Sequence, residues 1–209
     1  MSRRFDDRVD AGQALARLLS HYSGRPDVVV LGLARGGVPV AAEVAAALGA
    51  PLDVFVVRKI GAPGRPELAV GAIASGGASV WNDDVMASLS IDRSSLDETV
   101  AAEQTELDRR ERLYRGDRPR PPVEGRTVIL VDDGLATGAS MRAAVGAVRQ
   151  LGAQTLIVAV PTAPRGTDLG PEVDEFVCAA MPSPFRAVAS SYRRFPQTSD
   201  EEVRALLDR

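Results

Sequence analysis

The chain has 209 residues, of which 45% are hydrophobic, so it is long enough for one domain with an ordinary core. Its net charge of −3 at pH 7 excludes a general attraction to nucleic acid or to acidic membranes. The single cysteine excludes an internal disulfide, and no stretch is long and apolar enough to span a membrane, so we expect a cytoplasmic location.

The first third of the sequence alternates between helical and strand patterns. Going along the chain, we expect a helix over 9–22, a buried strand over 28–33, a turn over 34–37, a helix over 38–48 and a second strand over 52–57. Strands that alternate with helices in this way are typical of a parallel sheet.

The middle third begins with a segment, 61–77, that is rich in Gly, Pro and Ala and has no helical period. A long irregular stretch in a small domain is usually a lid or a binding loop, so we expect a flexible loop over about 60–80. A polar helix is expected over 94–114, followed by a proline-rich linker over 115–125. The basic run over 109–120 includes the end of this helix. We expect it to be a solvated surface, because cations are favourable at a helix C-terminus.

The last third returns to the alternating pattern. We expect a strand over 128–131, a helix over 141–151, strands over 155–160 and 176–180, and a short helix over 203–207. The sequence therefore predicts an α/β fold over 1–209, with a Rossmann-like parallel sheet flanked by helices. In such folds ligands bind at the carboxyl ends of the strands. The segments 35–37, 58–59, 132–140 and 161–165 should therefore converge on one edge.

The run from Val128 to Ser140 is the most informative part of the chain. Its strand is followed by Asp132 and Asp133, and then by a loop of small residues at the start of a helix. Backbone N–H groups at a helix N-terminus bind phosphate, and the glycine at position 138 would let the anion approach closely. The two carboxylates would repel a phosphate, so we expect them to bind sugar hydroxyls or a divalent cation.

This run resembles the 5-phosphoribosyl-1-pyrophosphate (PRPP) motif of type I phosphoribosyltransferases. The resemblance implies that Asp132 and Asp133 contact the ribose hydroxyls and, indirectly, Mg²⁺. It implies that the 5′-phosphate is held by Ala136, Thr137, Gly138, Ala139 and Ser140. A small hood formed by 1–25 and 161–209 would complete the fold.

Two further segments offer cations for a pyrophosphate. Arg35, Gly36 and Gly37 supply a guanidinium and unobstructed N–H groups at a helix start, and they resemble the family's pyrophosphate loop, which often contains a cis peptide. Arg58 and Lys59 resemble a basic pair of the orotate-type members, and Lys59 is the single lysine in the chain. These three cations and the two aspartates are the expected catalytic groups.

The acceptor is less well determined. Ala136 stands where hypoxanthine–guanine enzymes of the family carry an aspartate, which disfavours a 6-oxopurine. The segment 161–165 and the aromatic residues Phe185, Tyr192 and Phe195 are candidates for contacting a base, although core packing is the better explanation of the aromatic residues.

The resemblance extends over 5–208 and includes the loop sequence Val-Arg-Lys-Ile-Gly-Ala-Pro-Gly of a group of predicted phosphoribosyltransferases. It implies PRPP-dependent transfer of phosphoribose to a nitrogenous base or related acceptor, with release of pyrophosphate. Two alternatives remain: a regulator that senses PRPP or a nucleotide, and a hydrolase of phosphorylated sugars or nucleotides. No nucleic-acid or membrane partner is expected, and a homo-oligomer is compatible with the sequence.

Overall fold

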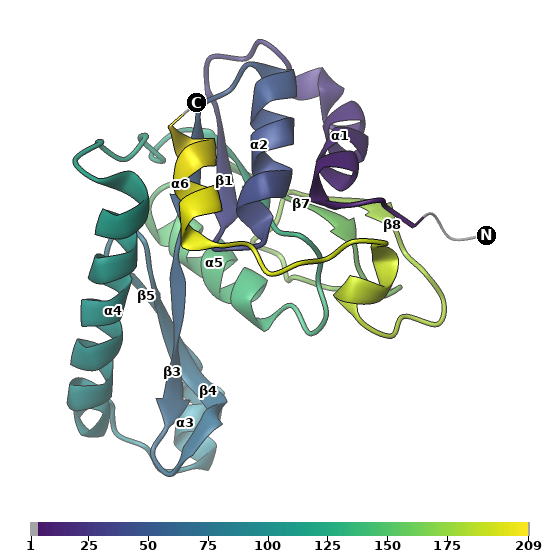
Figure 1. The fold of residues 1–209 in the computed structure, drawn as a ribbon. Helices are drawn as coiled ribbons and strands as arrows, with labels where there is room; N and C mark the ends of the chain where they lie inside the picture. Colours follow the sequence, from purple (N-terminus) through teal and green to yellow (C-terminus); the bar gives the residue numbers. More distant parts are fainter. Residues whose placement is uncertain (1–3, 209) are drawn as a thin grey trace.

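Two β-sheets organise the chain (Figure 1). The structure is a computed structural model that describes residues 4–208. The first sheet is parallel, has the order β2-β1-β6-β7-β8, and consists of β1 (Val28–Leu33), β2 (Leu52–Phe55), β6 (Thr127–Val131), β7 (Thr155–Thr162) and β8 (Glu175–Ala180). The second is antiparallel, has the order β3-β4-β5, and consists of β3 (Val57–Ala62), β4 (Arg65–Ala74) and β5 (Ala78–Trp81).

Helices cover both faces of the parallel sheet. α1 (Arg8–Leu18), extended by a 3₁₀ turn at Ser20–Tyr22, and α2 (Gly37–Leu48) pack on one face, and α5 (Ala139–Gln150) packs on the other. Successive residues of β6 alternate between the two cores: Val128 faces the α5 side and Ile129 the α1–α2 side. This two-sided burial explains the uninterrupted apolar strands of the sequence.

The second sheet extends away from the first, together with α4 (Asp97–Arg115) (Figure 1). Ile60, Met86 and Leu107 belong to the separate core that these elements share with α3 (Asp83–Ser88) and the 3₁₀ turn at Arg93–Leu96. The far end of α4 is tied to the parallel sheet by a buried ion pair between Arg115 and Asp53 (2.8 Å). α6 (Asp200–Leu207) packs against both α2 and α4.

The structure corrects the sequence analysis in the segment 52–80. The strand expected over 52–57 is two strands in different sheets, and Val56 alone separates them. The irregular loop expected over about 60–80 is mostly β3, β4 and β5, so that expectation is wrong. The few apolar residues of this segment face a small core, and its glycines interrupt the alternation of apolar and polar residues that indicates a strand. Flexibility of this hairpin stays a prediction. The linker expected over 115–125 in fact begins at residue 116, because Arg115 is the last residue of α4.

The other predicted strands and helices agree with the observed ones to within a few residues, whereas the short helix α3 was not predicted. In the order β2-β1-β6-β7-β8, the chain crosses over in opposite directions from β1 and β6, which lie side by side. Such a switch point opens a crevice at the carboxyl ends of the two strands. Within residues 4–208, no helix is both long enough and apolar enough to cross a membrane.

Candidate functional site

The switch point brings two of the predicted segments into contact. A Cβ on Gly36 would lie 2.0 Å from Asp133 Oδ2, and a Cβ on Gly37 would lie 2.5 Å from the carbonyl oxygen of Val131. At Gly37 only glycine fits without a backbone shift, and at Gly36 a Cβ would displace the Asp133 carboxylate, because the loop after β1 lies directly against the loop after β6. The Ala34–Arg35 peptide bond is cis.

The carboxylate of Asp133 is held by the two ends of the described chain. Arg8 donates from Nε (2.9 Å) and Nη2 (2.7 Å) to Asp133 Oδ2, and from Nη1 to the carbonyl of Pro196 (2.6 Å). Its guanidinium lies 3.9 Å from the ring centroid of Phe195. The Tyr192 hydroxyl donates to the Asp133 carbonyl (2.5 Å). The acidic residues therefore sit in a fixed, largely buried frame.

The two carboxyls of the pair are electrostatically unlike. Burial, and next the charge of Asp133, raise the pKa of Asp132 well above its usual value. Burial also raises the pKa of Asp133, but the hydrogen bonds and charge of Arg8 act in the opposite direction. Asp132 Oδ1 accepts the backbone N–H of Asp133 (2.8 Å), a bond that either protonation state can keep. Asp132 is thus the member that ionises at the greater cost.

The Asp132→Asn variant should be more stable than wild type, by a margin that grows with pH. Below the unfolded-state pKa both states hold the proton, so the carboxyl contributes nothing. As pH rises, the unfolded chain loses the proton first, and the folded state then carries a cost that Asn removes. Melting temperatures between pH 4 and pH 8, measured without added Mg²⁺, test this. Asp84→Asn removes an exposed carboxylate and controls for charge. No gain for Asp132→Asn at pH 8 would contradict the prediction.

The loop over 136–140 has the geometry of an anion site. Gly138 has a φ of +73° and caps α5, whose first turn supplies backbone N–H groups. The Ala139 N–H donates to Thr137 Oγ1 (3.4 Å), and Arg142 Nη2 donates to the Thr137 carbonyl (2.7 Å). Both Thr137 and Ser140 are exposed. The loop is shaped by its own residues and open to a ligand.

A cavity of about 480 Å³ lies beside the acidic pair. Its lining includes Arg8, Arg35, Gly36, Asp133, Arg110 and Thr198. Of the sequence-predicted residues, the cavity thus brings together Arg35, Gly36, Asp133 and Phe195.

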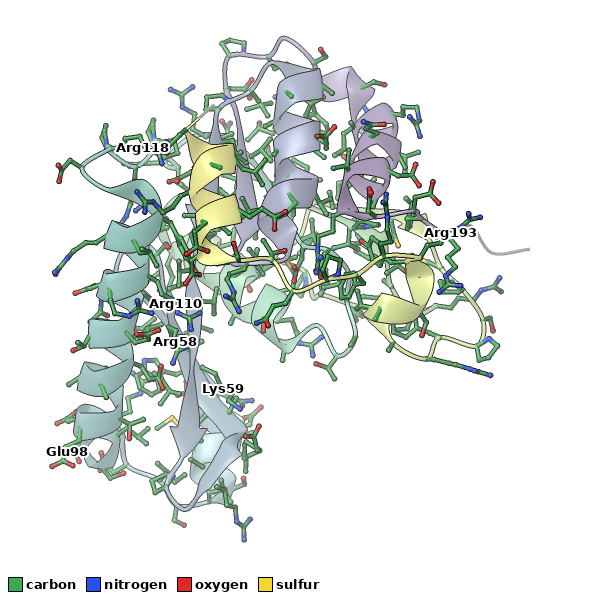
Figure 2. All side chains as sticks on the ribbon, viewed as in Figure 1. Arg58, Lys59, Glu98, Arg110, Arg118 and Arg193 are labelled. Carbon is green, nitrogen blue, oxygen red and sulfur yellow. The ribbon has the colours of Figure 1, made fainter. Side chains whose placement is uncertain are left out.

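Arg58 and Lys59 do not line this cavity and do not end a strand of the parallel sheet. They lie near the start of β3 and project to opposite sides of it (Figure 2). Arg58 Nη2 lies 2.6 Å from Glu103 Oε2 on α4, and Lys59 Nζ lies 3.2 Å from Glu67 Oε2 on β4. Their expected convergence with the other segments is wrong in this conformation, because β3 leaves the parallel sheet at Val56.

Sequence reasoning missed several cavity residues, among them Arg8, Arg110 and Thr198. A signal existed for Arg110, because it lies at helical spacing from Leu107 and Tyr114, the apolar residues that face inward on α4. Reading the whole run 109–120 as one solvated face obscured this. Nothing local marks Arg8 or Thr198, because both enter the site through packing of distant segments.

Core packing is confirmed for Tyr192. It is 1% exposed and packs between Phe5 and Phe195, at ring distances of 5.7 and 4.7 Å. Phe195 differs, because it is part of the cavity lining.

Known proteins share the sequence and the fold described above. The sequence profile of the family described as "Phosphoribosyl transferase domain" matches residues 6–182. Two curated Mycobacterium tuberculosis proteins, from two strains and both provisionally named as phosphoribosyl transferases, are 50% identical to this chain over 207 residues. That alignment covers 98% of this chain and 46% of each relative, so the chain spans about half the length of the curated relatives it matches.

Solved structures share the whole architecture. The crystal structure of a Thermus thermophilus protein is 44% identical, with a TM-score of 0.83, and the match covers 98% of this chain and 97% of that one. A hypothetical protein from Neisseria gonorrhoeae, solved with bound ppGpp, has a TM-score of 0.52 over 100% of this chain and 97% of its own. At 12% identity, the second shares the fold alone.

Proposed function

Because the chain belongs to the phosphoribosyl transferase domain family, we propose that it transfers phosphoribose from PRPP to a nitrogenous acceptor and releases pyrophosphate. The observation that carries the proposal is the contact between the glycine loop after β1 and the acidic pair after β6. This contact brings a cation-bearing loop against the two carboxylates, and the open loop over 136–140 follows them directly in the chain.

In the proposed complex, Asp132 and Asp133 accept hydrogen bonds from the ribose hydroxyls. The exposed N–H groups and hydroxyls of 136–140 hold the 5′-phosphate. Arg35, Gly36 and Gly37 bind the pyrophosphate, and their cation stabilises the negative charge that develops on it. Each group thereby recognises a different part of one sugar phosphate.

The proposed reaction is a displacement at C1 of the ribose. The bond between C1 and the pyrophosphate oxygen breaks, and the pyrophosphate leaves with the electron pair. A nitrogen lone pair of the acceptor forms the new bond to C1, and the acceptor then loses a proton. Because C1 gains positive character, water must be excluded, and closure of the β3–β4 hairpin over the crevice would do this.

The acidic pair fits a Mg²⁺ ion that is coordinated jointly by protein carboxylates and by oxygens of the donor, rather than by protein side chains alone. Among the described residues, no group of three or more His, Cys, Asp or Glu side chains gathers as a metal site. Mg²⁺ commonly binds through one or two carboxylates together with substrate oxygens. When bound through Asp132 or Asp133 and the donor, it would neutralise charge on the pyrophosphate.

The residue at position 136 narrows the class of acceptor. Ala136 is exposed at the phosphate loop and brings no carboxylate that could remove a proton from a base. This supports an acceptor other than a 6-oxopurine. The decisive experiment incubates the protein with PRPP, Mg²⁺ and a panel of bases and follows pyrophosphate release. Release that needs a base supports transfer, release without any base supports a hydrolase, and binding without release supports a sensor.

Lys59→Ala should lower turnover while leaving the melting temperature nearly unchanged. Lys59 is 46% exposed, and its partner Glu67 is 97% exposed, so the ion pair contributes little to stability. Hairpin closure would bring the lysine to the leaving pyrophosphate. Glu67→Ala is the matched control, because it breaks the same ion pair but keeps the cation. Equal loss of kcat/KM in both variants, or no loss in Lys59→Ala, would remove Lys59 from the proposed site.

A further inference from the structure

The cavity beside the acidic pair has one wall that does not belong to any of the predicted loops. Arg110 comes from the middle of α4, and Thr198 comes from the segment between the last 3₁₀ turn (Val188–Ser191) and α6. Neither residue has a role in the proposed function as stated so far. Their position opposite the loop of Arg35 raises the question of what they contact there.

Arg110 is held toward the cavity by its helix. Leu107 and Tyr114, one turn before and after it, are both buried, so Arg110 lies on the inward side of α4 (Figure 2). Its Nε donates to Glu106 Oε1 (2.7 Å), which fixes the direction of the guanidinium. Arg109 binds the same Glu106 carboxylate but is 58% exposed, against 30% for Arg110, and does not line the cavity.

The guanidinium of Arg35 is linked to α4 through Asp200 of α6. Arg35 Nη1 lies 3.5 Å from Asp200 Oδ1, and the Tyr114 hydroxyl donates to the same oxygen (2.6 Å). Burial and this hydrogen bond raise the pKa of Tyr114 to about 12, while the charges of Arg110 and Arg35 act against the increase. Two cations from separate elements therefore border the same space.

Thr198 gives an independent sign of a missing partner. It is 3% exposed, it lines the cavity, and its Oγ1 has no hydrogen-bond partner among the described residues. A buried hydroxyl without a partner costs free energy, and such groups often mark the place of a ligand or a water. Within 4–208, the lining also carries three guanidiniums and one carboxylate, Asp133, which pairs with Arg8. Arg35 and Arg110 pair with Asp200 and Glu106, which do not line the cavity. The three guanidiniums in the lining and the free hydroxyl both suit an anion.

We propose that Arg110, assisted by Thr198, binds the pyrophosphate of the donor opposite the loop of Arg35. This inference rests on the proposed function and adds a leaving-group cation that no motif residue supplies. The planar guanidinium can bind two phosphate oxygens at once. Unlike Arg58 and Lys59, Arg110 lines the crevice without closure of the hairpin.

Calorimetry with three ligands separates this contact from the rest of the site. PRPP with Mg²⁺, inorganic pyrophosphate with Mg²⁺, and ribose 5-phosphate are titrated into wild type, Arg110→Ala, Arg110→Lys and Arg109→Ala. Arg110→Ala should weaken PRPP and pyrophosphate at least tenfold and leave ribose 5-phosphate unchanged. Arg110→Lys should retain part of the affinity, and Thr198→Val should weaken the same two ligands less than Arg110→Ala does. Arg109→Ala loses the same helical contact to Glu106 and should bind like wild type.

The outcomes distinguish the inference from the function on which it rests. Wild-type affinity of Arg110→Ala for both pyrophosphate ligands overturns the inference alone. Equal weakening of all three ligands also overturns it, because it indicates a structural role. If the wild type binds pyrophosphate through Arg110 but does not bind PRPP, the proposed function fails and the anion site stands. If the wild type binds none of the ligands, both fail.

Discussion

Replacing both Asp132 and Asp133 by asparagine should weaken PRPP binding at least tenfold, a loss of about 1.4 kcal/mol or more. Asparagine keeps the shape of each side chain but offers one acceptor oxygen and no charge to the ribose hydroxyls and Mg²⁺. The substitution also frees Arg8 from its ion pair, which places an unbalanced cation beside the sugar site. Calorimetric titration of PRPP with Mg²⁺ measures the effect.

The chain contains a matched control for this double variant. Asp83 and Asp84 are also adjacent aspartates, and both are exposed in the first turn of α3. Their conversion to asparagine changes the net charge by the same amount and should leave PRPP affinity unchanged. A folded Asp132→Asn/Asp133→Asn protein with wild-type affinity would end the assignment of the acidic pair to the donor.

Gly37→Ala should abolish most donor binding and lower stability together. The added methyl would lie 2.5 Å from the Val131 carbonyl oxygen and 2.9 Å from Asp132 Cα, and backbone cannot turn aside as a flexible side chain could. Overpacking of this kind costs about 1–3 kcal/mol, and relief would separate the two loops that form the crevice. We expect at least a tenfold loss of PRPP affinity and a melting temperature lower by several degrees, roughly 2–4 °C per kcal/mol.

A second glycine separates instability from damage to the site. Gly125 has a φ of +68° with open space around its Cβ position, and it lies in the connection before β6. Gly125→Ala should cost about 1 kcal/mol through backbone strain and leave PRPP affinity intact. If Gly37→Ala bound PRPP as tightly as Gly125→Ala does, the close contact between the loops would not matter for the site.

The parallel sheet and its crevice could be predicted from sequence because both depend on local signals. The apolar run Val128–Val131 is buried on both faces, and the acidic pair and small residues after it occupy the expected strand end. Arg35–Gly37 follows β1 in the same way. Periodicity and turn chemistry determine these features within about ten residues of chain.

The second sheet and the outer wall of the cavity could not be predicted in that way. β3 and β4 contain glycine and proline at positions that break the alternating pattern, and the two strands pack against α4, which lies about thirty residues further along the chain. Arg8 and Thr198 reach the cavity through contacts between segments far apart in the chain. The hydrophobic periodicity of one segment does not show which distant segment it will contact.

The contacts between the two ends of the described chain around Asp133 affect the order in which the protein folds. The Arg8 bond to Pro196 and the Phe5 N–H bond to the Ser191 carbonyl join residues that are separated by most of the chain. Contacts of such high sequence separation carry a large loop-closure entropy and tend to form late. On the ribosome, the sheet through β7 could assemble while the segment around Tyr192 is not yet made. The nascent protein would therefore acquire its fold before its binding site. The ability to bind a ligand would arise in a distinct final step.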